Sequence, residues 1–456
     1  MSLSLLDRVS TLLATPSDAL PCPVQTGGWL TSCRMGKRVG FLVLTDGSST
    51  EPLQVVVPDA LLQSHTDLRR LSSGCSVRVT GELVLSQGAG QRVELQATAV
   101  EVMGWVEDPE TYPIQPKPLG ADFLRTVPHL RARVKHVAAV SRLRHGLAHA
   151  IHDYFSRQDF LWVATPVLTQ GDAEGAGERF QVVTEEGPDA FFGQPTYLTV
   201  SGQLEAEALC MALGRVYTFG PTFRAEKSRT SRHLAEFWMV EPEVAFADLQ
   251  DLMGLAEGLV KASVAHALAH LPEEMALFEE MGGLPMEQWQ RLVEQPFAHL
   301  TYTQAIERLT ATEHVFETQV AWGDDLHAEH ERWLVEDASR PVFVTDYPAG
   351  IKAFYMKPAQ DGRTVAAFDL LVPRVGELVG GSEREEDLQR LVDRMMACGL
   401  DPAQYGDYLD LRRYGTVPHG GFGLGFERLV AFLSGMPSVK DTIAFPRTHG
   451  CARPEA

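Results

Sequence analysis

The segment from Phe219 to Glu243 constrains the fold more than any other part of the chain. Both of its flanks are apolar and aromatic, whereas its middle is polar and basic, which predicts two strands joined by a charged loop. The loop contains no glycine, so it differs from the tight Asn-Gly turns of simple hairpins. Because side chains alternate along a strand, one face of the return strand carries Phe237, Met239, Glu241 and Glu243. An aromatic ring and carboxylates next to arginines predict a slot for a base, phosphates and an amine.

A solvated basic loop is the plain alternative, because runs of charge usually lie at the surface. Glu241 and Glu243 weigh against it, since they stand inside an otherwise apolar strand. A buried charge is costly unless it has a partner. These carboxylates therefore predict a site with charged partners.

A second segment, His419 to Gly435, is dense in glycine and predicts a strand that runs into an amphipathic helix. Its glycines allow a ligand to approach the backbone closely. The first turn of the helix carries Glu427 and Arg428, and a helix N-terminus with an arginine suits a phosphate. Such a turn is a weak signal alone, but it complements the basic hairpin.

Together the two segments resemble motifs 2 and 3 of the class II aminoacyl-tRNA synthetases. The matching stretches are Phe-Arg-Ala-Glu at 223–226, Arg-His-Leu-Ala-Glu-Phe at 232–237, and Gly-Phe-Gly-Leu-Gly-Phe-Glu-Arg at 421–428. The resemblance extends over the whole chain. It is closest to the aspartate/asparagine/lysine subgroup, and within it to the asparaginyl members. It implies an AMP-forming ligase that activates asparagine with ATP as an adenylate and passes it to an asparagine-specific tRNA.

The length of 456 residues allows two domains with substantial cores. Between residues 21 and 104, short β-rich runs recur about every 10 residues, which predicts a five-stranded OB-fold barrel. With the resemblance, this gives an anticodon-binding domain at 1–104, a proline-rich hinge at 105–125 and a catalytic domain at 126–456.

The catalytic part is predicted to be α+β, with a mainly antiparallel sheet flanked by helices. Helical patterns mix with strands at 136–157, 247–270, 287–294 and 384–399. The first of them, with the strand after it and Pro166, matches motif 1, which forms the dimer interface in the family. The resemblance thus implies a homodimer joined around Pro166, although an ordinary helix–strand unit would show the same pattern.

On the predicted barrel, Arg34, Phe41 and Gln54 suit an RNA partner. An aromatic ring beside basic residues is a common way to stack and hold unpaired bases. In the family, residues matching Phe41 and Gln54 contact anticodon bases. A lone phenylalanine in a strand also fits a core position, so the anticodon role depends on the resemblance.

The phosphate-binding residues implied by the resemblance are mostly arginines. This suits a reaction that needs alignment and neutralised charge at phosphorus rather than a tuned general base. Arg224 would hold the α-phosphate and the reacting carboxylate. Arg428 and His233 would hold the γ-phosphate, and Arg232 would also contact ATP.

The resemblance also implies an adenine site and a Mg²⁺ site. Phe237 would stack under the adenine ring with Arg428 on the other side, and Glu226 would accept a proton from the adenosine or the tRNA end. Asp369 and Glu377 match the family's metal-binding pair, and carboxylates are the ligands that Mg²⁺ prefers. Their spacing is one residue longer than in the aspartyl relatives.

Substrate choice follows from a few positions. By resemblance, Glu174 and Gln203 hold the substrate ammonium group, and Arg384 meets its side-chain oxygen. Ala206 replaces a lysine of the aspartyl relatives, and Glu241 replaces an aspartate. A bound aspartate would face Glu241 without that lysine, and like charges at about 4 Å cost several kcal/mol at an effective dielectric near 20. The sequence therefore favours asparagine.

Three alternatives remain open. An aspartyl enzyme, including one that charges two tRNAs, is opposed by Ala206. A tRNA-independent asparagine synthetase related to these enzymes would lack the anticodon barrel. An inactive paralogue serving as a binding module would not need Arg224, Phe237, Glu377 and Arg428 together.

Composition limits the partners and the cellular compartment that can be expected for this chain. The net charge of −20 excludes nonspecific attraction to nucleic acid over the whole surface. The six cysteines are scattered without a Cys-x-x-Cys pair, which favours reduced thiols in a cytoplasm. No apolar run is expected to approach the roughly 20 residues that span a bilayer, so no membrane partner is predicted.

Overall fold

The computed structural model describes residues 6–88, 90–171, 179–188, 191–228 and 230–451. The chain forms two compact units, one reaching Arg142 and the other beginning at Leu143. The change from one unit to the other falls inside helix α4 (Lys135–Arg157). The domain borders at 104 and 125 stay a prediction.

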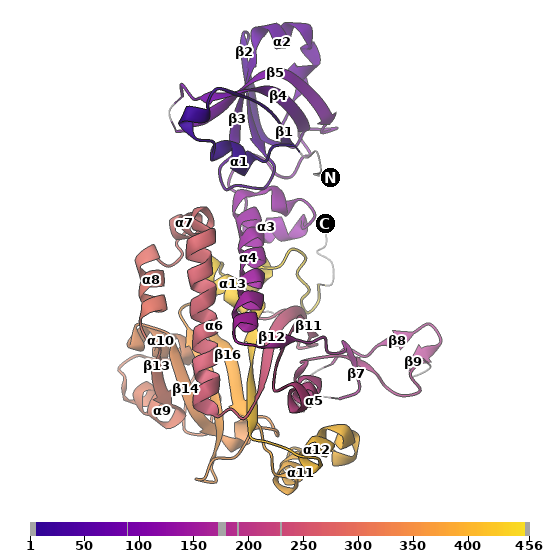
Figure 1. The fold of residues 1–456 in the computed structure, drawn as a ribbon, viewed down its shortest axis with the longest axis vertical. Coiled ribbons are helices and arrows are strands. Elements are labelled where there is room, and N and C mark those ends of the chain that lie inside the picture. The colour runs from indigo at the N-terminus through magenta and orange to yellow at the C-terminus, as the bar shows by residue number, and fades with distance from the viewer. Residues whose placement is uncertain (1–5, 89, 172–178, 189–190, 229, 452–456) are drawn as a thin grey trace. The chain divides into compact units, whose positions relative to one another are not determined.

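The first unit contains a closed five-stranded barrel with the strand order β1-β2-β3-β5-β4 (Figure 1). The strands are β1 (Cys22–Met35), β2 (Val39–Thr45), β3 (Leu53–Pro58), β4 (Ser76–Leu85) and β5 (Val93–Gly104). Alternate residues of β2 and β3 are buried, so Leu42, Leu44 and Val55 fill the barrel. The predicted OB-fold is confirmed. The helices of this unit include α1 (Val9–Leu13), α2 (Asp59–Ser64) and α3 (Ala121–Thr126).

The second unit contains an eight-stranded sheet with the order β13-β14-β15-β16-β17-β12-β11-β6. Only its two outermost pairs, β13–β14 and β11–β6, are parallel among these strands. The predicted α+β fold with a mainly antiparallel sheet is therefore confirmed. The strands are β6 (Leu161–Trp162), β11 (Arg215–Phe223), β12 (Glu236–Ala245), β13 (Ala298–Thr301), β14 (Val342–Pro348), β15 (Thr364–Val372), β16 (Gly376–Glu383) and β17 (His419–Gly425).

Helices flank this sheet (Figure 1). Helix α6 (Leu249–His270) packs against β15, β16 and β17, and a capping box at Asp248 fixes its start. By length and composition α6 could cross a membrane, contrary to the expectation from the sequence. One face of α6 is buried in the core of this unit, which explains why the helix is apolar.

The other helices of this unit are α5 (Gln203–Leu213), α7 (Pro272–Glu280), α8 (Met286–Glu294), α9 (Tyr302–Ala311), α10 (Ala328–Ala338), α11 (Leu388–Ala397), α12 (Gly406–Arg413) and α13 (Phe426–Ser434). Two short ribbons pair β7 (Leu168–Thr169) with β10 (Tyr197–Leu198) and β8 (Val183–Thr184) with β9 (Gly187–Pro188).

The glycines of β17 allow it to lie close against β12. Met239 pairs with Gly425 and Glu243 pairs with Gly421 across the two strands. A Cβ atom on Gly421 would collide with the backbone oxygen of Pro242 on β12. The glycine-rich strand β17 is therefore the direct neighbour of β12, the strand whose side chains include the predicted site residues.

Candidate active site

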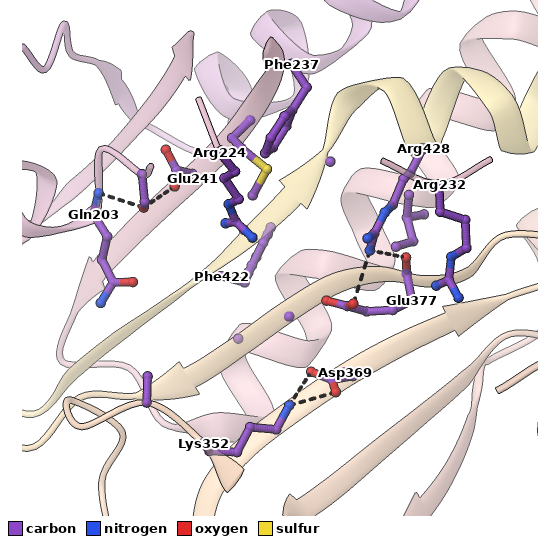
Figure 2. Close-up of a pocket in the computed structure, with 18 of the residues that line it drawn as sticks. Gln203, Arg224, Arg232, Phe237, Glu241, Lys352, Asp369, Glu377, Phe422 and Arg428 are labelled. Carbon is purple, nitrogen blue, oxygen red and sulfur yellow. Dashed lines mark hydrogen bonds and ion pairs between the residues drawn. The ribbon is translucent and has the colours of Figure 1, made fainter. Parts of the chain in front are cut away.

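A cavity of about 330 Å³ lies in the second unit, at the centre of the sheet (Figure 2). Its walls come from the β11–β12 hairpin, β15, β16, β17, the start of α13 and the segment 351–356. The predicted catalytic, ATP-binding, amino-acid-binding and metal residues that the structure describes all line it: Gln203, Arg224, Glu226, Arg232, His233, Phe237, Glu241, Asp369, Glu377, Arg384 and Arg428. Glu174 lies outside the described residues. The alternation predicted for β12 is also correct, since Phe237, Met239, Glu241 and Glu243 all face the cavity.

At one end of the cavity, arginines and glutamates form a network of ion pairs and hydrogen bonds. The Nη1 atom of Arg428 donates to a carboxylate oxygen of Glu377 at 3.1 Å and to its carbonyl oxygen at 2.9 Å (Figure 2). Arg232 donates to Glu331 at 2.8 Å, and the same Glu331 oxygen accepts from the backbone N–H of Glu377. Burial alone would raise the pKa of the Glu377 carboxyl, but Arg428 and Lys352 lower it to about 2. Carboxylates thus hold Arg232 and Arg428 in place, and the phosphates of a ligand could replace these carboxylates as partners of the two arginines.

Arg224 and Phe237 form the middle of the cavity. The guanidinium carbon of Arg224 lies 5.5 Å from the ring centroid of Phe237, an arrangement suited to a cation beside a stacked base. Next to them, His233 contacts the hydroxyl of Ser228 at 3.1 Å, and its Nε2 lies 3.6 Å from Glu226. Burial lowers the pKa of His233 and the surrounding arginines add to this, against the raising effect of Glu226. His233 is therefore neutral near pH 7 and would meet a phosphate as a hydrogen-bond donor.

The other end of the cavity holds the buried side chains of Glu241, Glu243 and Arg384. The buried carboxylate of Glu241 accepts from Ser201 through one oxygen, and from Thr218 and the backbone N–H of Gly202, each at 3.0 Å, through the other. Arg384 forms a two-point ion pair with Glu243. It also donates to Ser382 at 2.8 Å and lies over the ring of Tyr355 at 5.0 Å.

The pairing with Glu243 sets the electrostatics of this end. Burial disfavours the charged guanidinium, but Glu243 raises the pKa of Arg384 above its ordinary value. Arg384 is thus a fixed donor whose charge is already neutralised. Beside the acceptor Glu241, it offers hydrogen bonds for a neutral polar group and no surplus positive charge for a carboxylate.

The two predicted metal ligands lie close together on neighbouring strands. A Cβ atom on Gly380 would stand 3.3 Å from an Asp369 carboxylate oxygen and 3.2 Å from one of Glu377. Asp369 on β15 pairs with Gly380, and Glu377 on β16 pairs with Leu371. The register of the two strands shifts between these two pairs, at Leu370 and Leu371. Converging hard oxygens at a glycine suit Mg²⁺.

Lys352 is a cavity residue that the sequence did not indicate. Its Nζ donates to both carboxylate oxygens of Asp369, at 2.8 and 3.1 Å, and lies 3.9 Å from the ring centroid of Tyr347 (Figure 2). Burial would lower the pKa of this ammonium, but Asp369 and Glu377 hold it above its ordinary value. The only sequence signal is a single lysine leaving a buried strand, which is too common to identify a site.

The predicted RNA-contacting residues lie on the barrel of the first unit. Arg34 and Phe41 are cross-strand partners on β1 and β2, and the guanidinium carbon lies 5.7 Å from the ring centroid. Phe41 alternates with the fully buried Leu42, so it faces outward rather than into the core. Gln54 on β3 pairs with Val43, which places it on the neighbouring strand near Phe41.

The fold and the cavity together define a class II tRNA synthetase. Residues 121–449 match the family described as tRNA synthetases class II (D, K and N), and residues 24–103 match the OB-fold nucleic acid binding domain.

Similar proteins narrow the class further. The asparagine–tRNA ligase of Desulfotalea psychrophila is 51% identical over 448 residues, which cover 98% of this chain and 99% of that protein. The asparagine–tRNA ligase of Thermosynechococcus vestitus is 51% identical over 440 residues, covering 93% and 95%. The crystal structure of asparaginyl-tRNA synthetase from Pyrococcus horikoshii complexed with asparaginyl-adenylate matches with a TM-score of 0.88 at 34% identity, over 99% of both chains. The chain belongs to the asparagine–tRNA ligase family.

Proposed function

We propose that this chain attaches asparagine to its cognate tRNA through an asparaginyl-adenylate, with ATP as the second substrate. One observation carries this proposal: Glu241 and the Arg384–Glu243 pair line the same cavity as Arg224 and Arg428. A carboxamide can donate to Glu241 and accept from Arg384. An aspartate would bring a third carboxylate to two that are already buried.

The proposed mechanism relies on alignment. In Figure 2, Arg224 lies between Glu241 and the Arg428–Glu377 pair. There it would hold the asparagine carboxylate against the α-phosphate as the carboxylate oxygen attacks phosphorus and pyrophosphate leaves. Arg428, Arg232 and neutral His233 would hold the departing phosphates, and Phe237 would stack on adenine.

Transfer to tRNA and metal binding involve two further sets of residues. In the transfer step a ribose hydroxyl of the tRNA end would attack the adenylate carbonyl, the bond to AMP would break, and Glu226 would accept the hydroxyl proton. Asp369 and Glu377 would hold Mg²⁺, which neutralises phosphate charge when bound.

ATP–pyrophosphate exchange tests the proposed function directly. We expect exchange with asparagine and not with aspartate or lysine, and aminoacyl product only when tRNA is added. Exchange with aspartate instead would favour an aspartyl enzyme. Free asparagine formed from aspartate without tRNA would favour the tRNA-independent synthetase. The cytoplasm is the proposed location, in keeping with six free thiols.

We also propose that the barrel binds the tRNA anticodon through Phe41, with Arg34 and Gln54 beside it. The outward position of Phe41 and its contact with Arg34 support a stacking platform. Replacing Phe41 with alanine should raise the KM for tRNA about tenfold, since one stacked base contributes about 1–3 kcal/mol. Exchange without tRNA should not change. Phe123→Ala, which removes an exposed ring elsewhere in the same unit, is the control. Equal KM values for tRNA in both variants would refute the assignment.

We propose a homodimer joined at the sheet edge next to Pro166. Strand β6 ends the sheet there, and Leu161 and Trp162 are 52% and 57% exposed. Exposed apolar residues on an edge strand suit a second copy of the chain. We expect the chain to sediment as a dimer and Trp162→Glu to sediment as a monomer. Tyr414→Glu, which changes an exposed ring on α12's C-terminal side, should remain dimeric. A wild-type monomer would exclude this proposal.

A further inference from the structure

Glu207 is a buried carboxylate at the centre of a polar network next to the amino-acid end of the cavity. It lies one helical turn after Gln203 on α5, and its side chain has no exposure to solvent. One oxygen accepts from Gln203 Nε2 at 3.0 Å and from the Tyr408 hydroxyl at 2.9 Å. The other contacts Arg412 Nη2 at 2.9 Å and His419 Nε2 at 3.1 Å.

This environment keeps Glu207 ionised. Burial by itself would raise the pKa of the carboxyl, but Arg412 and His419 hold it well below its usual range. An ionised carboxylate only accepts hydrogen bonds. The group that Gln203 turns toward Glu207 must therefore be its NH₂ group, because the network fixes which way an amide points.

The orientation of Gln203 has a consequence inside the cavity. With its nitrogen held by Glu207, its carbonyl oxygen is the atom left for the cavity that Gln203 lines. A carbonyl oxygen attracts an ammonium group, whereas an amide turned the other way would present N–H groups to it and repel it. A glutamine without a partner could adopt both orientations.

We propose that Glu207 is a positioning residue for the amino-acid substrate, locking the Gln203 amide so that its oxygen accepts from the substrate's α-ammonium group. This inference rests on the proposed function, since it requires an amino acid in the cavity. Glu207 itself does not touch the substrate. Arg384 Nε lies 3.8 Å from Glu207, beyond hydrogen-bond distance, and Arg384 is held by Glu243 and Ser382 instead.

Glu207→Asp in the full-length chain tests the lock. It keeps the negative charge that Arg412 requires but withdraws the carboxylate by about 1.5 Å, the length of one carbon–carbon bond. We expect the KM for asparagine in ATP–pyrophosphate exchange to rise about tenfold, the usual effect of losing a hydrogen bond to a charged group. The KM for ATP should stay unchanged. Glu274→Asp, at a buried glutamate on α7, is the matched control and should alter neither value.

A double-mutant cycle separates positioning from general support of the fold. Gln203→Leu removes the amide, so its KM for asparagine should already be high, and adding Glu207→Asp should raise it no further. A further rise in the double variant, or equal rises in both KM values for Glu207→Asp, would overturn the proposal. So would an unchanged KM for asparagine in Glu207→Asp.

The cycle also distinguishes this proposal from the proposed function. Every amino acid carries an α-ammonium group, so the cycle can be run with whichever amino acid the wild-type chain activates. Activation of aspartate would end the asparagine assignment and leave the Glu207 test intact. Activation of asparagine with an additive cycle would do the reverse, and activation of no amino acid would overturn both.

Discussion

Replacing Arg224 with alanine should reduce kcat for ATP–pyrophosphate exchange by about 10²–10³-fold, the usual effect of removing a fixed donor from developing charge in a transition state. The KM for ATP should change much less. Arg224 stands beside Phe237 between the two ends of the cavity, where the attacking carboxylate and the α-phosphate would meet. Negative charge gathers there mainly during the reaction, so the loss appears in kcat rather than in binding.

Two companion variants sharpen this measurement. Arg224→Lys keeps the charge but loses the fork of donors, and it should fall between wild type and alanine. Arg215→Ala removes an arginine from the start of β11, the strand that ends just before Arg224, and should exchange at the wild-type rate. An Arg224→Ala variant as active as Arg215→Ala would show that Arg224 takes no part in the reaction.

Glu241→Gln should lower the preference for asparagine over aspartate at least tenfold, measured as the ratio of kcat/KM values in exchange. Two causes act together. The change removes a buried negative charge that opposes a substrate carboxylate, and a tenfold ratio corresponds to only about 1.4 kcal/mol. It also replaces an acceptor by an amide whose NH₂ group would face the donors on Ser201, Thr218 and Gly202.

The matched control is Glu236→Gln, the same change at the start of the same strand. It should leave the ratio unchanged. If Glu241→Gln also leaves the ratio unchanged, Glu241 does not select the substrate. The discrimination would then have to come from the Arg384–Glu243 pair alone.

Local pattern predicted much of this fold. The alternation on the return strand placed Phe237 and Glu241 on the cavity face, and the regular spacing of β-rich runs predicted the five-stranded barrel. The helix starts predicted at 136, 247 and 287 lie within two residues of those observed. One helix start was predicted wrongly, because the pattern suggested a helix from Arg384. Asp387 caps that helix instead, so it begins at Leu388 and Arg384 remains at the end of the sheet.

The pairing of charges could not be read from local pattern. Arg384 and Glu243 are 141 positions apart in the sequence, and nothing near either residue indicates the other. Lys352 meets Asp369 because the chain turns back after β14 through residues 349–351, and local pattern does not show where that turn leads. The resemblance to a known family named side chains that line one cavity, whereas the fold shows which charged groups pair with one another there.

The ion pair between Arg428 and Glu377 gives this cavity a form of thermodynamic coupling. If Arg428 turns to a phosphate, as proposed, Glu377 loses its partner and becomes a better ligand for a divalent cation. Nucleotide and cation would then each raise the affinity for the other by the same factor, because linkage between two binding sites is reciprocal. This ion pair would thus make the two ligands bind cooperatively.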